Sequence, residues 1–176
     1  MGDIFNEYLV KRKNGPKQLL YKGLIGVAAI GLMALALYFL GVFALLVIVG
    51  VGVGIFFAYK EFDVEYEYAV TNDELDIDKI TSRERRKNIL TVNIKTIEIL
   101  APANGEHSAK MKNKSIRRTL DCSSGINDSR RWFAIFDDPK AGKTLLIFDP
   151  PKKMRNAIRT FIPRSVMEPK VSESEE

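Results

Sequence analysis

Cysteine and histidine, the residues that most often build reactive and metal sites, are almost missing from this chain. Its 176 residues include one cysteine, Cys122, and one histidine, His107. A lone thiol cannot form an internal disulfide, which excludes a secreted scaffold held by disulfide bonds. Neither residue has the partners that a zinc site or a catalytic triad requires. We therefore expect a buried, inert Cys122, a solvated His107, no metal, no cofactor and no enzymatic activity.

Charge is missing from one long stretch. Between Lys22 and Lys60 no side chain is charged, and the residues are mostly Leu, Ile, Val, Ala, Phe and Gly. A soluble domain of this size needs no such run, and a cleaved signal peptide has an apolar core of only about 7–15 residues. One bilayer crossing requires about 20 apolar residues. The stretch therefore indicates an integral membrane protein.

The length of the stretch favours two helices over one. A single helix over residues 23–59 would be roughly 55 Å long, against a hydrocarbon core of ~30 Å. A break at Leu40 and Gly41 gives helices over 21–39 and 42–59, and glycines in both allow close helix approach. We assign residues 21–60 to a transmembrane helical hairpin. A single tilted span is the alternative.

The N-terminal arm, residues 1–20, sets the expected orientation. Basic residues precede the first helix at positions 11, 12, 13, 17 and 22, which holds the N-terminus in the cytoplasm. A hairpin then returns the remaining domain to the cytoplasm, whereas a single span would place it outside. We predict a multi-pass protein of the cell membrane with both termini cytoplasmic. Within the arm, Asp3 and the apolar residues that follow it predict a small amphipathic helix at the lipid interface; a frayed terminus is the alternative.

Residues 61–165 have the pattern of a small α+β domain. Strict alternation over 64–70 and 75–80 predicts two strands joined by turn residues. Shorter apolar rows over 90–94, 97–99, 115–122, 131–136 and 144–148 add further strands. Asp149 is expected to cap a final helix that ends at Pro163. The fold is then a strongly bent antiparallel sheet or barrel of about seven strands with a C-terminal helix, and residues 166–176 form a disordered tail.

Four segments carry a resemblance to a known family. They are DVEYEY at 63–68, ELDIDKI at 74–80, IEILAP at 97–102 and the helix start FDP at 148–150. They resemble an uncharacterised family of small bacterial membrane proteins with two N-terminal transmembrane helices and a bacterial pleckstrin-homology-like (PH-like) C-terminal domain. The resemblance covers nearly the whole chain. It implies the hairpin and the PH-like fold, and it implies no known activity.

Charge is distributed in blocks along the domain. Residues 61–78 hold eight acidic residues and no basic one, whereas residues 79–164 hold twenty basic and eight acidic residues. Each Lys or Arg near an anionic leaflet contributes about 1 kcal/mol of attraction. The basic residues that we single out as candidate contacts for anionic lipid headgroups or a protein partner are Arg83, Arg85, Arg86, Lys87, Lys152, Lys153, Arg155 and Arg159. An ordinary solvated surface is the alternative.

Two other binding classes are disfavoured. The segment AGKT at 141–144 lacks the first glycine of a phosphate-binding loop, because Asp137 occupies that position. Nucleic acid is not expected, since aromatic residues are not interleaved with the basic ones. The sequence thus predicts a membrane-anchored, non-enzymatic binding or scaffold module at the cytoplasmic leaflet. The alternative is a structural or regulatory subunit of a larger membrane complex that docks through its hairpin. The ligand and the oligomeric state are left open.

Overall fold

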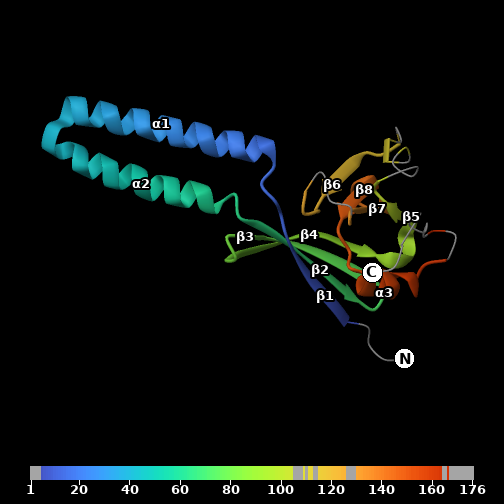
Figure 1. Ribbon diagram of the computed structural model, residues 1–176. Coiled ribbons are helices and arrows are strands. Elements are labelled where there is room, and N and C mark those ends of the chain that lie inside the picture. Colours follow the sequence, from blue (N-terminus) through green and yellow to red (C-terminus); the bar gives the residue numbers. More distant parts are fainter. Residues whose placement is uncertain are drawn as a thin grey trace.

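Two four-stranded sheets and three α-helices make up the described part of the chain. The computed structural model describes residues 5–104, 109, 111–112, 115–125, 130–163 and 166. One sheet has the order β1-β2-β3-β4 and the other β5-β7-β8-β6. Figure 1 shows both sheets and α3 forming a head, from which α1 and α2 project. The strands are β1 Phe5–Lys11, β2 Val64–Thr71, β3 Glu74–Thr81, β4 Arg85–Asn93, β5 Ile97–Pro102, β6 Arg118–Asp121, β7 Trp132–Asp138 and β8 Gly142–Phe148.

The first sheet is antiparallel throughout, and its central strands follow the predicted alternation. Tyr68 on β2 and Leu75 and Ile77 on β3 are fully buried. The β2–β3 connection turns at Asn72, whose φ of 53° suits a short polar side chain. The sequence therefore predicted this hairpin correctly.

The N-terminal arm is a strand, so the predicted interfacial helix is wrong. β1 pairs with β2 in antiparallel register, with Lys11 opposite Glu65. Val10 is buried whereas Leu9 is exposed, a period of two that suits a strand. The edge of β2 offers hydrogen-bonding groups that a separate surface helix would leave open, and β1 satisfies them.

Helical structure runs without a gap from Pro16 to Lys60. α1 spans Pro16–Leu40, a 3-10 turn η1 spans Gly41–Phe43, and α2 spans Ala44–Lys60. By length and composition this segment counts as one candidate membrane span. The expectation of two helices separated by a break, over 21–39 and 42–59, is therefore corrected, because η1 joins α1 and α2 into one continuous helical segment. The first helix starts early because Pro16 suits the first helical position and the Gln18 side chain accepts a hydrogen bond from Gly15 N.

The helical segment reverses direction at η1. Gly41 there has a φ of 53°, a conformation that costs glycine nothing. Near the other end, the Tyr59 hydroxyl donates to the Lys22 carbonyl at 3.0 Å, so residues far apart in sequence meet. α1 and α2 accordingly lie side by side (Figure 1).

This helical segment is an insertion between two neighbouring strands. Arg12 N donates to Val64 O at 2.9 Å, which extends the β1–β2 ladder by one residue beyond β1. The chain thus leaves the sheet at Arg12 and returns to it at Val64. Both ends of the helical segment consequently lie at the same end of the head.

The main core lies between the sheets and under α3. Trp132, Phe136 and Phe148 from the second sheet pack with the buried residues of the first, and Met154 and Ile158 of α3 close the cluster. In the second sheet β6 is parallel to β8, while the other pairs are antiparallel. Antiparallel pairing and a C-terminal helix confirm the predicted plan, but the strands form two sheets rather than one bent sheet, and the β6–β8 pair is parallel.

Several details of that plan are corrected. The described residues form eight strands rather than about seven, because β1 comes from the arm. α3 spans Lys152–Arg159, so it ends before Pro163, and Pro151 rather than Asp149 is its N-cap. The Asp149 carboxylate is engaged elsewhere, as an acceptor from Ser124 N at 2.7 Å. The predictions for His107 and for the tail beyond Val166 lie outside the described residues.

Candidate functional site

The first group of predicted contact residues lies at the base of the helices. Arg83, Arg85, Arg86 and Lys87 occupy the β3–β4 turn and the start of β4. The Ser82 hydroxyl donates to the Lys60 carbonyl at 2.7 Å, and Lys60 Nζ lies 2.8 Å from a Glu84 carboxylate oxygen. These contacts hold the turn against the end of α2. The structure therefore brings this basic group to the level at which the charge-free stretch ends.

Acidic partners offset most of this positive charge. Arg85 pairs with Glu61, and Arg86 pairs with Glu67, while Arg83 Nε lies 3.6 Å from a Glu65 carboxylate oxygen. Lys87 stands opposite Lys79 across the strand pair. Acidic side chains before and on β2 thus pair with basic side chains of the β3–β4 turn and of β4, although β3 lies between the two strands. The turn therefore presents less net charge than its sequence suggests.

Among the three carboxylates that pair with arginines here, the Glu67 side chain is the least exposed to solvent. Its burial and the neighbouring Glu7 raise the pKa of Glu67, and the guanidinium of Arg86 opposes that rise. The pairing with Arg86 therefore limits how far burial raises the pKa of Glu67.

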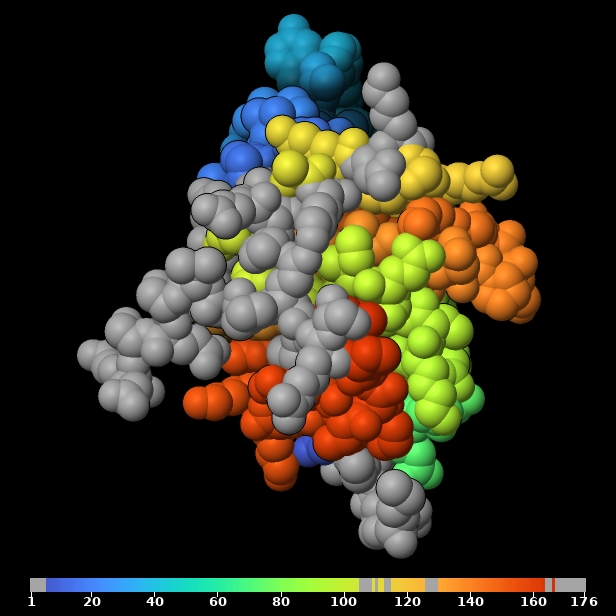
Figure 2. All heavy atoms as spheres, turned by 90° about the vertical axis from the view of Figure 1, so that its right-hand side faces the viewer, coloured from blue at the N-terminus to red at the C-terminus, as the bar shows by residue number. Residues whose placement is uncertain are grey.

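The second predicted group lies on α3. Lys152, Lys153, Arg155 and Arg159 belong to this helix. Figure 2 views the end of the head that is turned away from α1 and α2, and α3 lies on that end. The Arg155 guanidinium stacks 4.8 Å from the centre of the Trp132 ring and donates to the Pro150 carbonyl at 3.2 Å. The two predicted groups therefore do not share one face.

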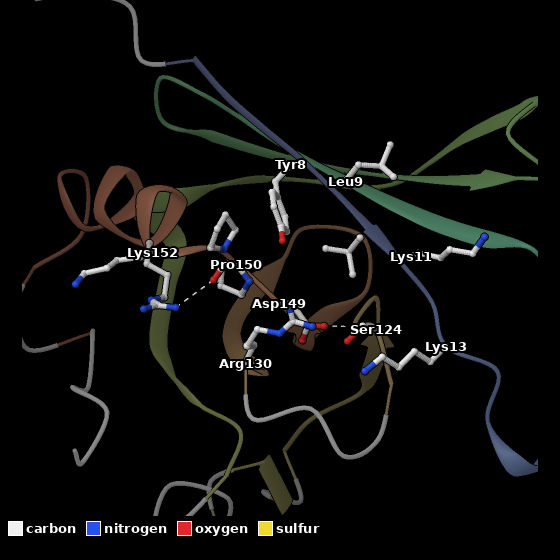
Figure 3. A pocket seen from close by; sticks show the side chains of 12 residues that line it. Tyr8, Leu9, Lys11, Lys13, Ser124, Arg130, Asp149, Pro150 and Lys152 are labelled. Carbon is white, nitrogen blue, oxygen red and sulfur yellow. Dashed lines mark hydrogen bonds between the residues drawn. The ribbon is translucent and has the colours of Figure 1, made fainter. Parts of the chain in front are cut away.

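A cavity of about 380 Å³ opens between β1 and the start of α3. Lys152 and Arg155, two of the predicted contact residues, line it. Lys11, Lys13 and Arg130 also line it, although sequence reasoning assigned them to the arm and a loop. Figure 3 shows Tyr8 pointing into the cavity towards Pro150, with Leu9 pointing away. A second cavity of about 250 Å³ continues along β1 between Glu7 and Lys153.

A buried carboxylate lies at the wall of the larger cavity. Asp149 is 5% exposed, and its Oδ2 takes the hydrogen bond from Ser124 N. Its Oδ1 is buried and has no hydrogen-bond partner among the described residues. An unsatisfied buried acceptor carries a desolvation penalty. Sequence reasoning missed this role because Asp before two prolines also fits a helix cap.

Tyr68 ties this wall to the opposite sheet. Its hydroxyl donates to the Cys122 carbonyl at 2.5 Å and accepts from Asp149 N at 3.4 Å. Burial raises the pKa of the Tyr68 hydroxyl, so the group remains a neutral donor. Cys122 is 2% exposed, and burial raises the pKa of its thiol to about 12. The predicted burial of Cys122 is confirmed.

Metal-binding and phosphate-binding residues are the remaining candidates from the sequence. Among the described residues no three His, Cys, Asp or Glu side chains are grouped closely enough to hold a metal ion. The segment at 141–144 leads into β8, not into a helix N-terminus, as the sequence predicted.

A third cavity of about 330 Å³ lies where α1 begins, between Lys17 and Asp121.

Two sheets that enclose one core under a C-terminal helix define a PH-like domain, here with a helical insertion after its first strand. The chain belongs to the family described as Bacterial PH-like domain (DUF6106), which matches residues 2–168. The match includes β1 and the helical segment, so both are parts of the family's domain. No curated protein and no solved structure matches the chain.

Proposed function

We propose that the protein is a membrane-anchored, non-enzymatic binding module whose head sits at the cytoplasmic leaflet. The observation that carries this proposal is the apolar surface of α1 and α2. Val42 is 92% exposed, and Leu46 and Phe39 are each 72% exposed. Soluble monomers rarely expose contiguous apolar patches beyond a few hundred Å². Lipid is the medium that covers such a surface without a specific partner.

The dimensions of the two helices support a full crossing. The charge-free residues 23–40 of α1 span about 27 Å, and residues 44–59 of α2 about 24 Å, close to the ~30 Å of a hydrocarbon core. Lys22 Nζ lies 5.3 Å from the centre of the Phe62 ring, so the two ends of the charge-free stretch lie at one level. Each helix would then cross once, with Tyr38 and Phe39 near the far interface.

The strand pairing and the basic arm support this sidedness. β1 and β2 are neighbours, so in a membrane the residues before α1 and after α2 would lie on one side of it. Basic residues mark the cytoplasmic side. Arg83, which is largely exposed at the base of the helices, is then the best-placed contact for anionic headgroups.

A second candidate function is that of a subunit that docks through its helices. Gly31, Gly50, Gly52 and Gly54 face open space, whereas Gly26 alone among the glycines of α1 and α2 approaches a side chain, the Tyr59 hydroxyl. The four glycines that face open space therefore take no part in the packing of α1 against α2. Their small surfaces suit close packing with another helix in lipid. A stoichiometric partner in a detergent pull-down that is lost on Gly50→Leu would support this function, and a clean monomer would argue against it.

The anchoring proposal is tested by cysteine labelling in vesicles of known sidedness. Val42→Cys places a thiol at the turn, and Val49→Cys is the matched control within α2. The native Cys122 gives little background because it is buried. A membrane-impermeant maleimide should label Val42→Cys in right-side-out vesicles and leave Val49→Cys unmodified. Labelling of Val42→Cys only in inside-out vesicles would refute the crossing.

A further inference from the structure

The outer edge of β1 presents backbone groups of Leu9 and Lys11 that have no backbone partner among the described residues. In an antiparallel ladder, alternate residues direct their N–H and C=O groups towards the neighbouring strand. Arg12 N donates to Val64 O, so the backbone N–H and C=O groups of Val10 and Tyr8, which lie two and four residues before Arg12, also point towards β2. Leu9 and Lys11 then direct their backbone groups outwards. No described residue forms a backbone hydrogen bond with these outward groups, although Lys13 N, next in phase, donates to Ser124 O at 2.6 Å.

This edge forms one wall of a groove. The cavities of about 380 and 250 Å³ both lie along β1, and the start of α3 forms the opposite wall. Figure 3 shows β1 crossing above the larger cavity, with Lys152 and Pro150 on the far side. An open strand edge beside a cavity is the arrangement into which an extended peptide adds as a further strand.

The chemistry of the groove specifies the peptide. Lys13, Lys152 and Arg155 line the larger cavity, and Lys153 lines the smaller one. The unpartnered Oδ1 of Asp149 lies among them as a buried acceptor. A small anion would place its charge beside this carboxylate, whereas a peptide brings N–H donors for the carboxylate and acidic side chains for the lysines.

We propose that the groove between β1 and α3 binds an extended, acidic segment of a partner protein, which pairs with the outer edge of β1. Its backbone bonds with Leu9 and Lys11, and its acidic side chains face the basic residues of α3. The inference rests on the proposed binding function of the head but not on membrane anchoring, so the labelling experiment above fails or succeeds independently.

The test uses the full chain in lipid nanodiscs and three fluorescent eight-residue peptides. The probe alternates Val and Glu; one comparison peptide alternates Val and Lys, and the other is the Val–Glu peptide with N-methylated backbone nitrogens. We expect the Val–Glu peptide to bind and both comparison peptides to bind at least about tenfold more weakly, because one loses charge complementarity and the other the backbone donors.

Two measurements locate the binding site. On adding the Val–Glu peptide, amide hydrogen exchange should slow at Leu9 and Lys11 but not at Val10, which already faces β2. Lys152→Glu should weaken binding about tenfold, whereas Lys140→Glu, a matched charge reversal in the β7–β8 turn, should not. A melting temperature equal to that of the wild type establishes that each variant is folded.

Several outcomes would overturn the proposal. Equal binding of the N-methylated peptide would exclude strand addition, and equal binding of the Val–Lys peptide would exclude acidic selectivity. Displacement by millimolar inorganic phosphate would indicate a small-anion site. Tighter binding after removal of residues 167–176 would identify this chain's own tail as the occupant instead of a partner.

Discussion

Excision of the helical insertion should leave a soluble, folded head. Arg12 and Val64 form a hydrogen-bonded pair at the end of the β1–β2 ladder, which is the pair that flanks a two-residue hairpin loop. Replacing residues 13–63 by Asn-Gly therefore joins the strands without changing their register. The core residues of the head all lie outside the excised segment, so its hydrophobic burial is retained.

The stability of the head without the helical insertion can be estimated from the contacts that it loses and from loop closure. The excision removes the Lys11–Asp63 ion pair, worth about 0–1 kcal/mol. It also removes the hydrogen bonds from Lys13 to Ser124 and from Ser82 to Asp63 and Lys60, each worth about 1 kcal/mol. The ion pairs of Lys60 and Glu61 with the β3–β4 turn are lost as well. Closing ten flexible residues rather than two costs about 1.4 kcal/mol more, from (3/2)RT ln 5. A version joined by a ten-residue Gly/Ser linker should consequently be less stable than the Asn-Gly version by about that amount.

The assay is fractionation without detergent followed by urea unfolding of both versions. Each should remain in the soluble fraction and unfold cooperatively, with the Asn-Gly version having the higher urea midpoint and an equal slope. Aggregation of both versions, or a molten state with no cooperative transition, would refute the view that the helices are an insertion outside the core. A more stable Gly/Ser version would show that Arg12 and Val64 do not form the terminal pair.

Three further changes test the head itself. Tyr68→Phe should lower the free energy of unfolding by about 1–3 kcal/mol in urea titrations, because the Cys122 carbonyl and the Asp149 N–H lose a buried partner. Iodoacetamide should leave Cys122 unmodified in the folded protein and alkylate it in urea; alkylation at equal rates would contradict its burial. Lys11→Met should raise the pKa of Asp63 towards 3.8 in an NMR titration, since the hydrogen bond from Lys11 lowers it. Because the pKa of Asp63 is lowered in the folded state, the pair stabilises the wild type above pH 3.8, and this stabilisation disappears as the pH falls through the lowered pKa. An unchanged pKa of Asp63 in Lys11→Met would rule out the pairing.

Local patterns predicted the elements whose contacts are local. The strands β2 and β3 alternate strictly and are joined by a two-residue turn, so neither their type nor their pairing depends on distant residues. α3 was found from its apolar face, and its bounds were missed because Pro151 competes with Asp149 for the cap position. The predicted α+β plan with a C-terminal helix required only these signals.

Long-range pairing was beyond local patterns. β1 is seven residues long, and its partner β2 follows only after the helical insertion. The apolar residues of the arm fit a helix or a strand equally well, and the open edge of β2 decides between them. β1 forms one wall of the groove. The charge pattern of the sequence therefore singled out Lys152 and Arg155 on α3, but not the residues of β1 that line the same cavity.

β1 links the groove to the proposed membrane anchor. Its last residues run into Arg12, whose guanidinium donates to the Tyr66 hydroxyl at 2.7 Å and to the Asp121 carbonyl at 3.3 Å, one contact with each sheet. On the other side, Phe62 N and Asp63 N continue the hydrogen bonding of α2 to carbonyls within it. Both connections between head and helices are therefore short and hydrogen-bonded, unlike a flexible tether. A peptide added to β1 would be held at a set angle to the helices, because the strand that it pairs with is the one that leads into α1.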